Sequence, residues 1–317
     1  MCALEGGDDG ALVTSLDAFK SCRLCPRECG VNRAAALGFC GCGIMARAGR
    51  AALHCWEEPC ISGARGSGAV FFSGCTLGCC FCQNHSISQE GLGKELTVPQ
   101  LADIFLRLQE QGAHNINLVT ATQYLPPILA ALDLVRHRLT IPIVYNCGGY
   151  ERVETVEALK DYVDIWLPDL KYFDSSLSGQ YSKAPDYFAV ASRAVTQMIS
   201  QTGPPILHRE AGVPDPIMDK GVIIRHMVLP GRKEDSIRLL KWMAEHLPGG
   251  QYYISLLSQY TPFHRNRFYP ELNRRVTSYE YQKVVDAALS LGLELGFMQK
   301  KSSAREEYTP AFDFTGL

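Results

Sequence analysis

The chain has 317 residues, of which 46% are hydrophobic and 20% charged, so it can bury a large core. Its formal net charge of −2 at pH 7 provides no strong positive field for a nucleic-acid backbone. No uninterrupted apolar stretch reaches the roughly 18 residues of a membrane span, and residues 1–10 lack the pattern of a secretory signal. We therefore expect a cytoplasmic protein that binds neither nucleic acid nor membrane.

The 13 cysteines are clustered along the chain rather than evenly spread. A long chain without a secretory signal does not suit a disulfide scaffold, so thiolate ligation of metal is the better interpretation. Cysteine content and apolar patterning divide the chain into four expected parts. They are a flexible leader (1–21), a cysteine-rich metal-binding segment (22–67), an α/β barrel region (68–300) and a C-terminal tail (301–317).

From residue 68 onward, short apolar runs alternate with longer amphipathic stretches, a pattern typical of βα units around a parallel sheet. The predicted strands are 69–74, 115–120, 141–146, 163–167, 221–229 and 251–258. The first predicted helix follows the N-cap residue Thr97 and ends at Gly112. Further predicted helices are 126–137, 152–161, 187–201, 233–246 and 278–291. Such alternation closes into a full or partial (βα) barrel, or opens into a doubly wound sheet.

A cysteine triplet with the spacing Cys-x3-Cys-x2-Cys, formed by Cys75, Cys79 and Cys82, directly follows the first predicted strand. Three thiolates on one loop can each bind one iron of a cubane cluster, whereas a structural cluster takes four cysteines. The remaining iron is open to S-adenosylmethionine (SAM), whose one-electron cleavage yields a carbon radical. The alternatives are a zinc loop, which needs a fourth ligand in structural use, and three ordinary buried cysteines. We expect Cys80 to point away from the ligands and to pack.

The triplet resembles that of the radical SAM superfamily. Further motifs resemble a family described as related to pyruvate formate-lyase activating enzymes. These motifs are Glu57 to Gly63, Phe71 to Cys75, Cys82 to Asn84, Asn115 to Thr120, Tyr145 to Tyr150, Leu167 to Lys171 and Arg225 to Gly231. The resemblance runs from about Cys22 to Gly292. It implies a partial (βα)6 TIM-like barrel, a [4Fe-4S] cluster, SAM, a 5′-deoxyadenosyl radical, and a low-potential reductant such as flavodoxin or ferredoxin.

In barrel enzymes the chemistry gathers at the carboxyl ends of the strands. Thr120 and Thr122 follow the second strand, where better-known activating enzymes carry a Gly-Gly-Glu segment that contacts the methionine amino group. Backbone carbonyls and a threonine hydroxyl could bind this amino group, although a plain turn is equally compatible. Asn146 and Gly149 follow the third strand, where the resemblance implies contacts to the ribose and amino group. The adjacent glycines allow close approach to a ligand, and would also suit a turn.

Two cationic residues complete the predicted SAM site. Pro168 cannot donate within a central strand, so the fourth strand should end there and leave Asp169 and Lys171 at the barrel mouth. The resemblance also implies a carboxylate-binding lysine at this position. Arg225 and His226 alternate in the fifth strand, so only one of them faces the interior. We predict that Arg225 does so as a carboxylate clamp, and that His226 faces the helices.

A second metal site is predicted in the N-terminal segment from the spacing of Cys22, Cys25, Cys29 and Cys40. An iron-sulfur cluster and a zinc knuckle both suit this spacing, and a site without metal stays an alternative. Ferredoxin-like inserts of activating enzymes usually follow the radical-cluster triplet, whereas this segment precedes it. His54, Cys55 and Cys60 could complete either site or simply pack. Glu57 and Glu58 could anchor the segment to the barrel.

Three functions follow from these features. The first is an enzyme that abstracts hydrogen from a substrate, which by resemblance is a glycyl Cα of a partner protein. The second is a radical SAM enzyme that matures a small molecule or a peptide. The third is a non-catalytic iron-sulfur electron carrier, which would normally shield its cluster with four cysteines and would not need a barrel with polar strand ends.

Overall fold

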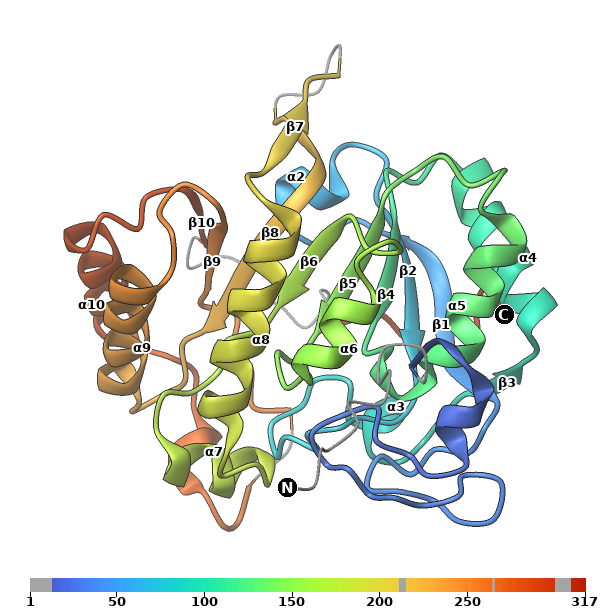
Figure 1. Ribbon diagram of the computed structural model, residues 1–317. Coiled ribbons are helices and arrows are strands. Elements are labelled where there is room, and N and C mark those ends of the chain that lie inside the picture. Colours follow the sequence, from blue (N-terminus) through green and yellow to red (C-terminus); the bar gives the residue numbers. More distant parts are fainter. Residues whose placement is uncertain (1–12, 211–214, 264–265, 300–308) are drawn as a thin grey trace, which may run out of the picture.

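The computed structural model describes residues 13–210, 215–263, 266–299 and 309–317 (Figure 1). In this part of the chain, ten strands form one sheet in the order β10-β9-β8-β6-β5-β4-β2-β1-β3, and β7 pairs with β8 beside this path. The strands are β1 (Ala46–His54), β2 (Ser67–Phe72), β3 (Lys94–Leu96), β4 (Ile116–Val119), β5 (Ile143–Cys147), β6 (Ile165–Pro168), β7 (Ile206–His208), β8 (Ile217–Met227), β9 (Tyr253–Leu257) and β10 (Gly296–Met298).

Six consecutive strands of this sheet, from β2 through β4, β5, β6 and β8 to β9, are parallel. They correspond to the six strands predicted from the sequence. Every residue of β2, β4, β5 and β6 is buried, which explains why these strands consist mostly of unbroken apolar runs rather than alternating patterns. The predicted fold class, an α/β partial barrel, is confirmed.

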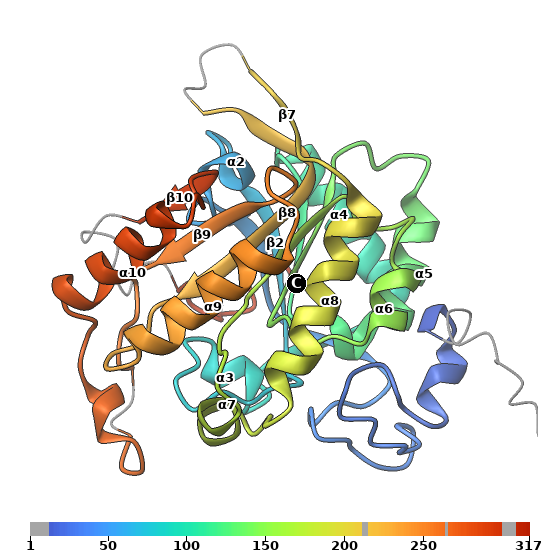
Figure 2. The same ribbon diagram turned by 60° about the vertical axis from the view of Figure 1, so that its left-hand side comes forward.

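The helices lie mainly on one side of the sheet, as the two views of the ribbon show (Figures 1 and 2). They are α2 (Pro59–Ser62), α3 (His85–Ser88), α4 (Val98–Glu110), α5 (Leu125–Val135), α6 (Val153–Ala158), α7 (Ser175–Ser182), α8 (Tyr187–Thr202), α9 (Lys233–His246) and α10 (Ser278–Ser290). Three short 3-10 helices are η1 (Leu16–Phe19), η2 (Thr122–Tyr124) and η3 (Pro270–Asn273). The predicted N-cap of α4 is present, because Thr97 and Gln100 form a reciprocal capping box.

Strand β1 comes from the segment that composition assigned to metal binding, yet it pairs antiparallel with β2 and β3 and extends the barrel sheet. The sheet therefore includes strands from both sides of residue 67, where the sequence predicted a boundary between two parts of the chain. The C-terminal residues also contact β1. The backbone N–H of Phe314 donates to the carbonyl of Gly49, and that of Ala51 donates to Thr315. Among the described helices, none is long and apolar enough to cross a membrane.

Candidate active site

A cavity of about 220 Å³ lies at the carboxyl ends of the parallel strands. Its wall includes the predicted cluster cysteines and most of the predicted SAM-binding residues. These lining residues are Cys75, Cys79, Cys82, Thr120, Thr122, Asn146, Lys171 and Arg225. Trp56 also lines the cavity and is 55% exposed, so the cavity reaches solvent beside this side chain. The parallel strands thus bring together side chains that are separated by 150 positions of sequence between Cys75 and Arg225.

The three cysteines of the triplet lie on the loop between β2 and α3, and each sulfur accepts a hydrogen bond. The amide of Leu77 donates to Cys75 at 3.4 Å, and the hydroxyl of Ser88 donates to Cys82 at 3.3 Å. The hydroxyl of Ser182, at the end of α7, donates to Cys79 at 2.9 Å. Hydrogen bonds to cysteine sulfur are one of the means by which proteins set the reduction potential of an iron-sulfur cluster.

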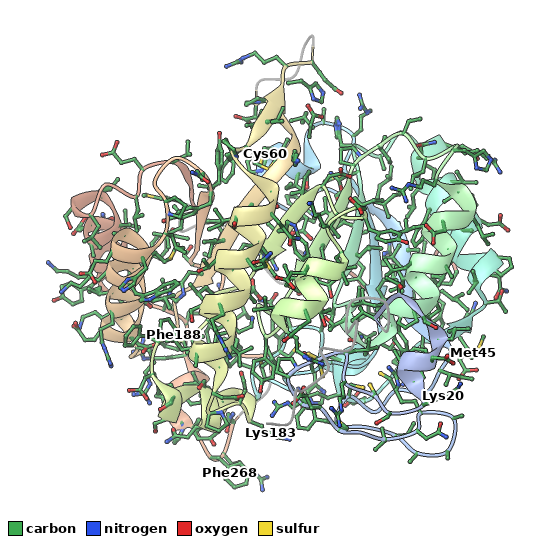
Figure 3. All side chains as sticks on the ribbon, viewed as in Figure 1. Lys20, Met45, Cys60, Lys183, Phe188 and Phe268 are labelled. Atoms are coloured by element: carbon green, nitrogen blue, oxygen red, sulfur yellow. The ribbon has the colours of Figure 1, made fainter. Side chains whose placement is uncertain are left out.

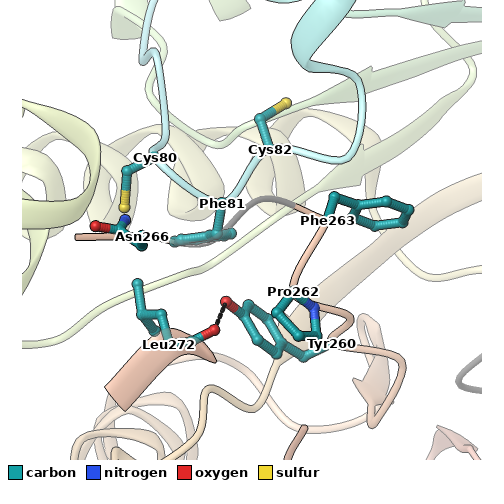
Figure 4. A pocket seen from close by; sticks show the side chains of 8 residues that line it. All are labelled: Cys80, Phe81, Cys82, Tyr260, Pro262, Phe263, Asn266 and Leu272. Atoms are coloured by element: carbon teal, nitrogen blue, oxygen red, sulfur yellow. Dashed lines mark hydrogen bonds between the residues drawn. The ribbon is translucent and has the colours of Figure 1, made fainter. Parts of the chain in front are cut away.

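Cys80 points away from the triplet, as its sequence position suggested. It lines a small hollow together with Tyr260, Asn266 and Cys82, and Figure 4 shows the sulfurs of Cys80 and Cys82 directed to different sides. The Tyr260 hydroxyl donates to the carbonyl of Leu272 at 2.7 Å, and Tyr260 does not line the cavity. Gln259, its neighbour, does line the cavity.

The donor set suits an iron-sulfur cluster, because three thiols border one cavity and soft thiolates are the ligands that iron-sulfur clusters take. Burial, with the nearby Cys75 and Cys82, raises the pKa of the Cys79 thiol to about 12, partly offset by Lys171 and Ser182. Cluster binding must therefore displace its proton. Within the described residues, no three His, Cys, Asp or Glu side chains are already gathered as a metal site. The three thiols nevertheless share one cavity wall.

The predicted SAM-binding threonines follow β4. Thr120 has a positive φ of 58°, which is uncommon for a β-branched residue, and its carbonyl accepts a hydrogen bond from Gln123 at 2.7 Å. The Thr122 hydroxyl lies 2.9 Å from a carboxylate oxygen of Glu151 and 2.8 Å from the hydroxyl of Tyr145. The cavity wall at this strand end is therefore held in an unusual backbone conformation by buried side chains.

The two glycines after β5 differ in what surrounds them. Gly148 lines the cavity, whereas Gly149 does not. Gly149 has a φ of 75°, and a Cβ at this position would lie 2.0 Å from the carbonyl oxygen of Asp169. Close packing on the β6 end thus accounts for the glycine at 149. Asn146 itself lines the cavity, and its amide accepts from Arg225 and donates to Glu57.

The cationic side chains of the cavity are paired with carboxylates. Arg225 donates from Nε to Asp169 at 3.0 Å, from Nη1 to Glu57 at 3.2 Å, and from Nη2 to Asn146 at 2.6 Å. Lys171 forms an ion pair with the other oxygen of Asp169. The neighbouring carboxylates raise the pKa of Arg225 despite its burial. As predicted, Arg225 faces the interior.

His226 faces the opposite side of β8. Its ring nitrogens lie 2.7 Å from the Leu170 carbonyl and 2.8 Å from the Ser236 hydroxyl on α9. Burial lowers its pKa to about 4, so the imidazole is neutral near pH 7. This is the satisfied buried histidine that the period-two pattern of the strand predicts.

Two carboxylates of the cavity were not predicted as site residues. Glu57 comes from the segment after β1 and also accepts a hydrogen bond from Asn117 at 3.1 Å. Glu151 follows β5, and burial raises its pKa to about 8, although hydrogen bonds from Thr122 and Cys147 act in the opposite direction. The sequence signals for Glu57 were the motif from Glu57 to Gly63 and the acidic pair before Pro59, and the pair indicated an anchor rather than a cavity residue.

The four N-terminal cysteines predicted to bind metal all lie in the irregular segment that precedes β1. Burial, nearby Glu151 and the thiols of Cys40 and Cys22 raise the pKa of Cys25, against a lowering hydrogen bond from the Arg27 backbone. The Cys29 sulfur accepts from the Phe39 amide at 3.4 Å, next to Cys40 in sequence. The structure therefore gathers these residues in one region, and their metal binding stays a prediction.

Cys60 does not belong to either cysteine group. It is buried in a separate apolar cluster with Ile61 and Met218. Figure 3 shows it near β7, at the end of the molecule opposite the cluster loop and the N-terminal segment. The idea that Cys60 completes one of the two sites is therefore wrong.

Residues 69–187 match the family model of the radical SAM superfamily. These residues form a radical SAM domain, and the resemblance drawn from the cysteine triplet is confirmed. Such a domain binds a [4Fe-4S] cluster and SAM. When bound, the cluster supplies the electron that cleaves SAM to a 5′-deoxyadenosyl radical. The protein is accordingly a radical SAM enzyme.

The chain is 29% identical over 289 residues to the uncharacterized protein MJ0674 of Methanocaldococcus jannaschii, covering 87% of this chain and 77% of that protein. Solved structures with a similar fold include SuiB of Streptococcus suis bound to the precursor peptide SuiA, at 14% identity and a TM-score of 0.45. That match covers 71% of this chain but only 46% of SuiB.

A second solved structure with a similar fold is QueE of Escherichia coli, at 13% identity and a TM-score of 0.43. That match covers 81% of this chain and 94% of QueE. A third is the methylornithine synthase PylB, at 15% identity and a TM-score of 0.46. That match covers 100% of this chain and 79% of PylB.

We predict that replacing Cys75, Cys79 or Cys82 by Ala abolishes SAM cleavage, because each removes one of three iron ligands. Cys80→Ala should retain the cluster, since its side chain lies outside the cavity. Iron content and the electron paramagnetic resonance (EPR) spectrum with and without SAM, measured on anaerobically reconstituted protein, test this. The assignment of Cys75, Cys79 and Cys82 as ligands would be contradicted if Cys80→Ala lost the SAM-responsive signal while the other three variants kept it.

We predict that Glu151 makes stability depend on pH. Its folded pKa of about 8 exceeds its ordinary value of 4.5, so the folded state retains a proton that the unfolded state has lost. The free energy of unfolding should therefore fall as pH rises from about 5 to about 8, relative to Glu151→Gln, which has no such proton. Urea unfolding of metal-free protein at both pH values measures the difference. Exposed Glu245→Gln is the control, and an equal effect of both substitutions would contradict the prediction.

Proposed function

We propose that this radical SAM enzyme abstracts hydrogen from a glycyl Cα of a partner protein. The observation that carries the proposal is the opening of the cavity. The cavity has to hold the cluster and SAM, and it reaches solvent beside the exposed Trp56. The substrate is therefore met at this opening, where a protein segment can be presented.

The charges of the cavity support the same substrate class. Arg225 is held by Asp169 and Glu57, and Lys171 is held by Asp169. Burial and nearby Glu57 raise the pKa of Glu58, against the attraction of Arg225. A small charged metabolite would have to displace one of these paired groups at a desolvation cost. A glycyl residue is neutral and has no side chain, so its binding does not require a charged partner in the cavity.

We also propose that Lys171 binds the carboxylate of SAM and that Thr120, Thr122 and Asn146 lie along the remainder of the cofactor. Lys171 is close enough to Cys79 for the two side chains to interact electrostatically. It therefore lies between the cluster cysteines and the charged wall. The guanidinium of Arg225 already donates to three protein acceptors. Arg225 would therefore act mainly by keeping Asp169 in place. A low-potential flavodoxin or ferredoxin would supply the electron.

We predict that Lys171→Met raises the dissociation constant of SAM by at least about tenfold, because losing a charge-assisted hydrogen bond costs about 1.5–3 kcal/mol. Methionine matches the unbranched lysine side chain up to the ε position but lacks the ammonium group. Isothermal titration of reconstituted protein gives the constant, and iron content verifies the cluster. Lys160→Met, at an exposed lysine beyond α6, should bind SAM as the wild type does. Unchanged binding in Lys171→Met would assign this lysine to structure or substrate.

The substrate prediction can be tested with deuterium. Cells of the source organism are grown on glycine deuterated at Cα, and their anaerobic extract is separated by filtration into protein and small-molecule fractions. The reconstituted enzyme, SAM and a reductant are added to each fraction. We predict deuterium in 5′-deoxyadenosine only with the protein fraction, together with a glycyl radical signal in EPR. Deuterium transfer from the small-molecule fraction alone would contradict a protein substrate.

A further inference from the structure

Arg27 connects the N-terminal cysteine segment to the loop that carries the cluster cysteines. It lies between Cys25 and Cys29 in sequence. Its Nε donates to the carbonyl of Thr76 at 2.8 Å, and its Nη2 contacts that of Leu77 at 3.5 Å. Both carbonyls belong to the stretch between Cys75 and Cys79. A side chain outside the radical SAM domain thus holds the backbone of the cluster loop.

The same guanidinium binds the end of α7. It donates to the carbonyls of Ser182, at 3.2 Å, and Lys183. The last carbonyls of a helix have no partner within the helix and carry partial negative charge, so a cation is favourable there. The α7 end in turn contacts the cluster loop: Ser182 donates to the Cys79 sulfur, and the Tyr181 carbonyl accepts from the Cys80 amide at 2.8 Å.

Aromatic rings fix the guanidinium in this position. Its central carbon lies 3.9 Å from the centre of the Phe39 ring and 5.2 Å from that of Tyr150. Phe39 belongs to the N-terminal segment and Tyr150 follows β5. The segment, α3 and α7 lie together at one end of the molecule, opposite β7 (Figures 1 and 2), and Figure 3 shows Lys183 at the same end. The planar fork of arginine can satisfy several carbonyls at once, which lysine cannot.

We propose that Arg27 is a positioning residue for the radical cluster, one that aligns the Cys75–Cys82 loop with α7 and so delivers the Ser182 hydrogen bond to the Cys79 sulfur. The proposal rests on the radical SAM domain and does not depend on which substrate the enzyme uses.

Hydrogen exchange of the metal-free protein tests the positioning directly. Arg27→Met should accelerate amide exchange in residues 76–82 by at least about tenfold, the effect of losing one charge-assisted hydrogen bond. Arg27→Lys, which keeps the charge without the fork, should lie between this variant and the wild type. The matched control is Thr155→Val, which removes a 2.9 Å hydrogen bond from α6 to the carbonyl of Leu24 in the same segment. It should change exchange in 76–82 by less than about twofold.

Redox titration of reconstituted protein gives a second, independent readout. Loss of a hydrogen bond to the Cys79 sulfur should make the midpoint potential of the cluster more negative in Arg27→Met, and less so in Arg27→Lys. Thr155→Val should keep the wild-type potential. Wild-type exchange and potential in Arg27→Met would overturn the proposal. Equal effects in Arg27→Met and Thr155→Val would also overturn it, because general undocking of the segment would then be the cause.

Discussion

A buried set of charges joins the strand ends on which the site depends. The guanidinium of Arg225 on β8 binds Asp169 after β6, Asn146 on β5 and Glu57 after β1. Burial acts to raise the pKa of Asp169, but Arg225 and Lys171 lower it below its ordinary value. Removing one member of such a set leaves an uncompensated buried charge, which is strongly destabilising. The positions of three parallel strands and of the β1 segment are therefore coupled where the cavity forms.

The family model matches residues 69–187, yet residues before and after this region also form or support the site. Glu57 and Arg27 precede the matched region, and Arg225 follows it. The C-terminal residues contribute as well: Phe312 packs edge-on against Phe71 of β2 at 5.6 Å, and Thr309 lines the cavity. The triplet thus supplies the cluster chemistry, while flanking segments supply much of the wall and of the support for the loop.

The sequence predicted the parallel strands well because each is a buried apolar run bounded by turn residues. It did not reveal β1, whose sequence ARAGRAALH is poor in β-branched and aromatic residues, nor the three-residue strands β3, β7 and β10. The alternation of Arg225 and His226 was informative because a strand has a period of two. The sequence indicated that Glu57 anchors its segment to the barrel, but its partner Arg225 could not be predicted, since their proximity arises only when the barrel forms.

The cluster loop has little regular structure of its own, so its backbone is held by side chains from elsewhere. Gln123 donates to the carbonyls of Ser73, at 3.0 Å, and Gly74, and Gln89 donates to that of Cys79 at 2.8 Å. With Arg27 and the α7 end, these anchors come from four separate parts of the chain. In a zinc finger the metal itself supplies the folding free energy. Here the main core cluster consists largely of aliphatic and aromatic side chains, and the loop is fixed by elements that form with that core. Cluster assembly should therefore follow folding of the barrel rather than drive it.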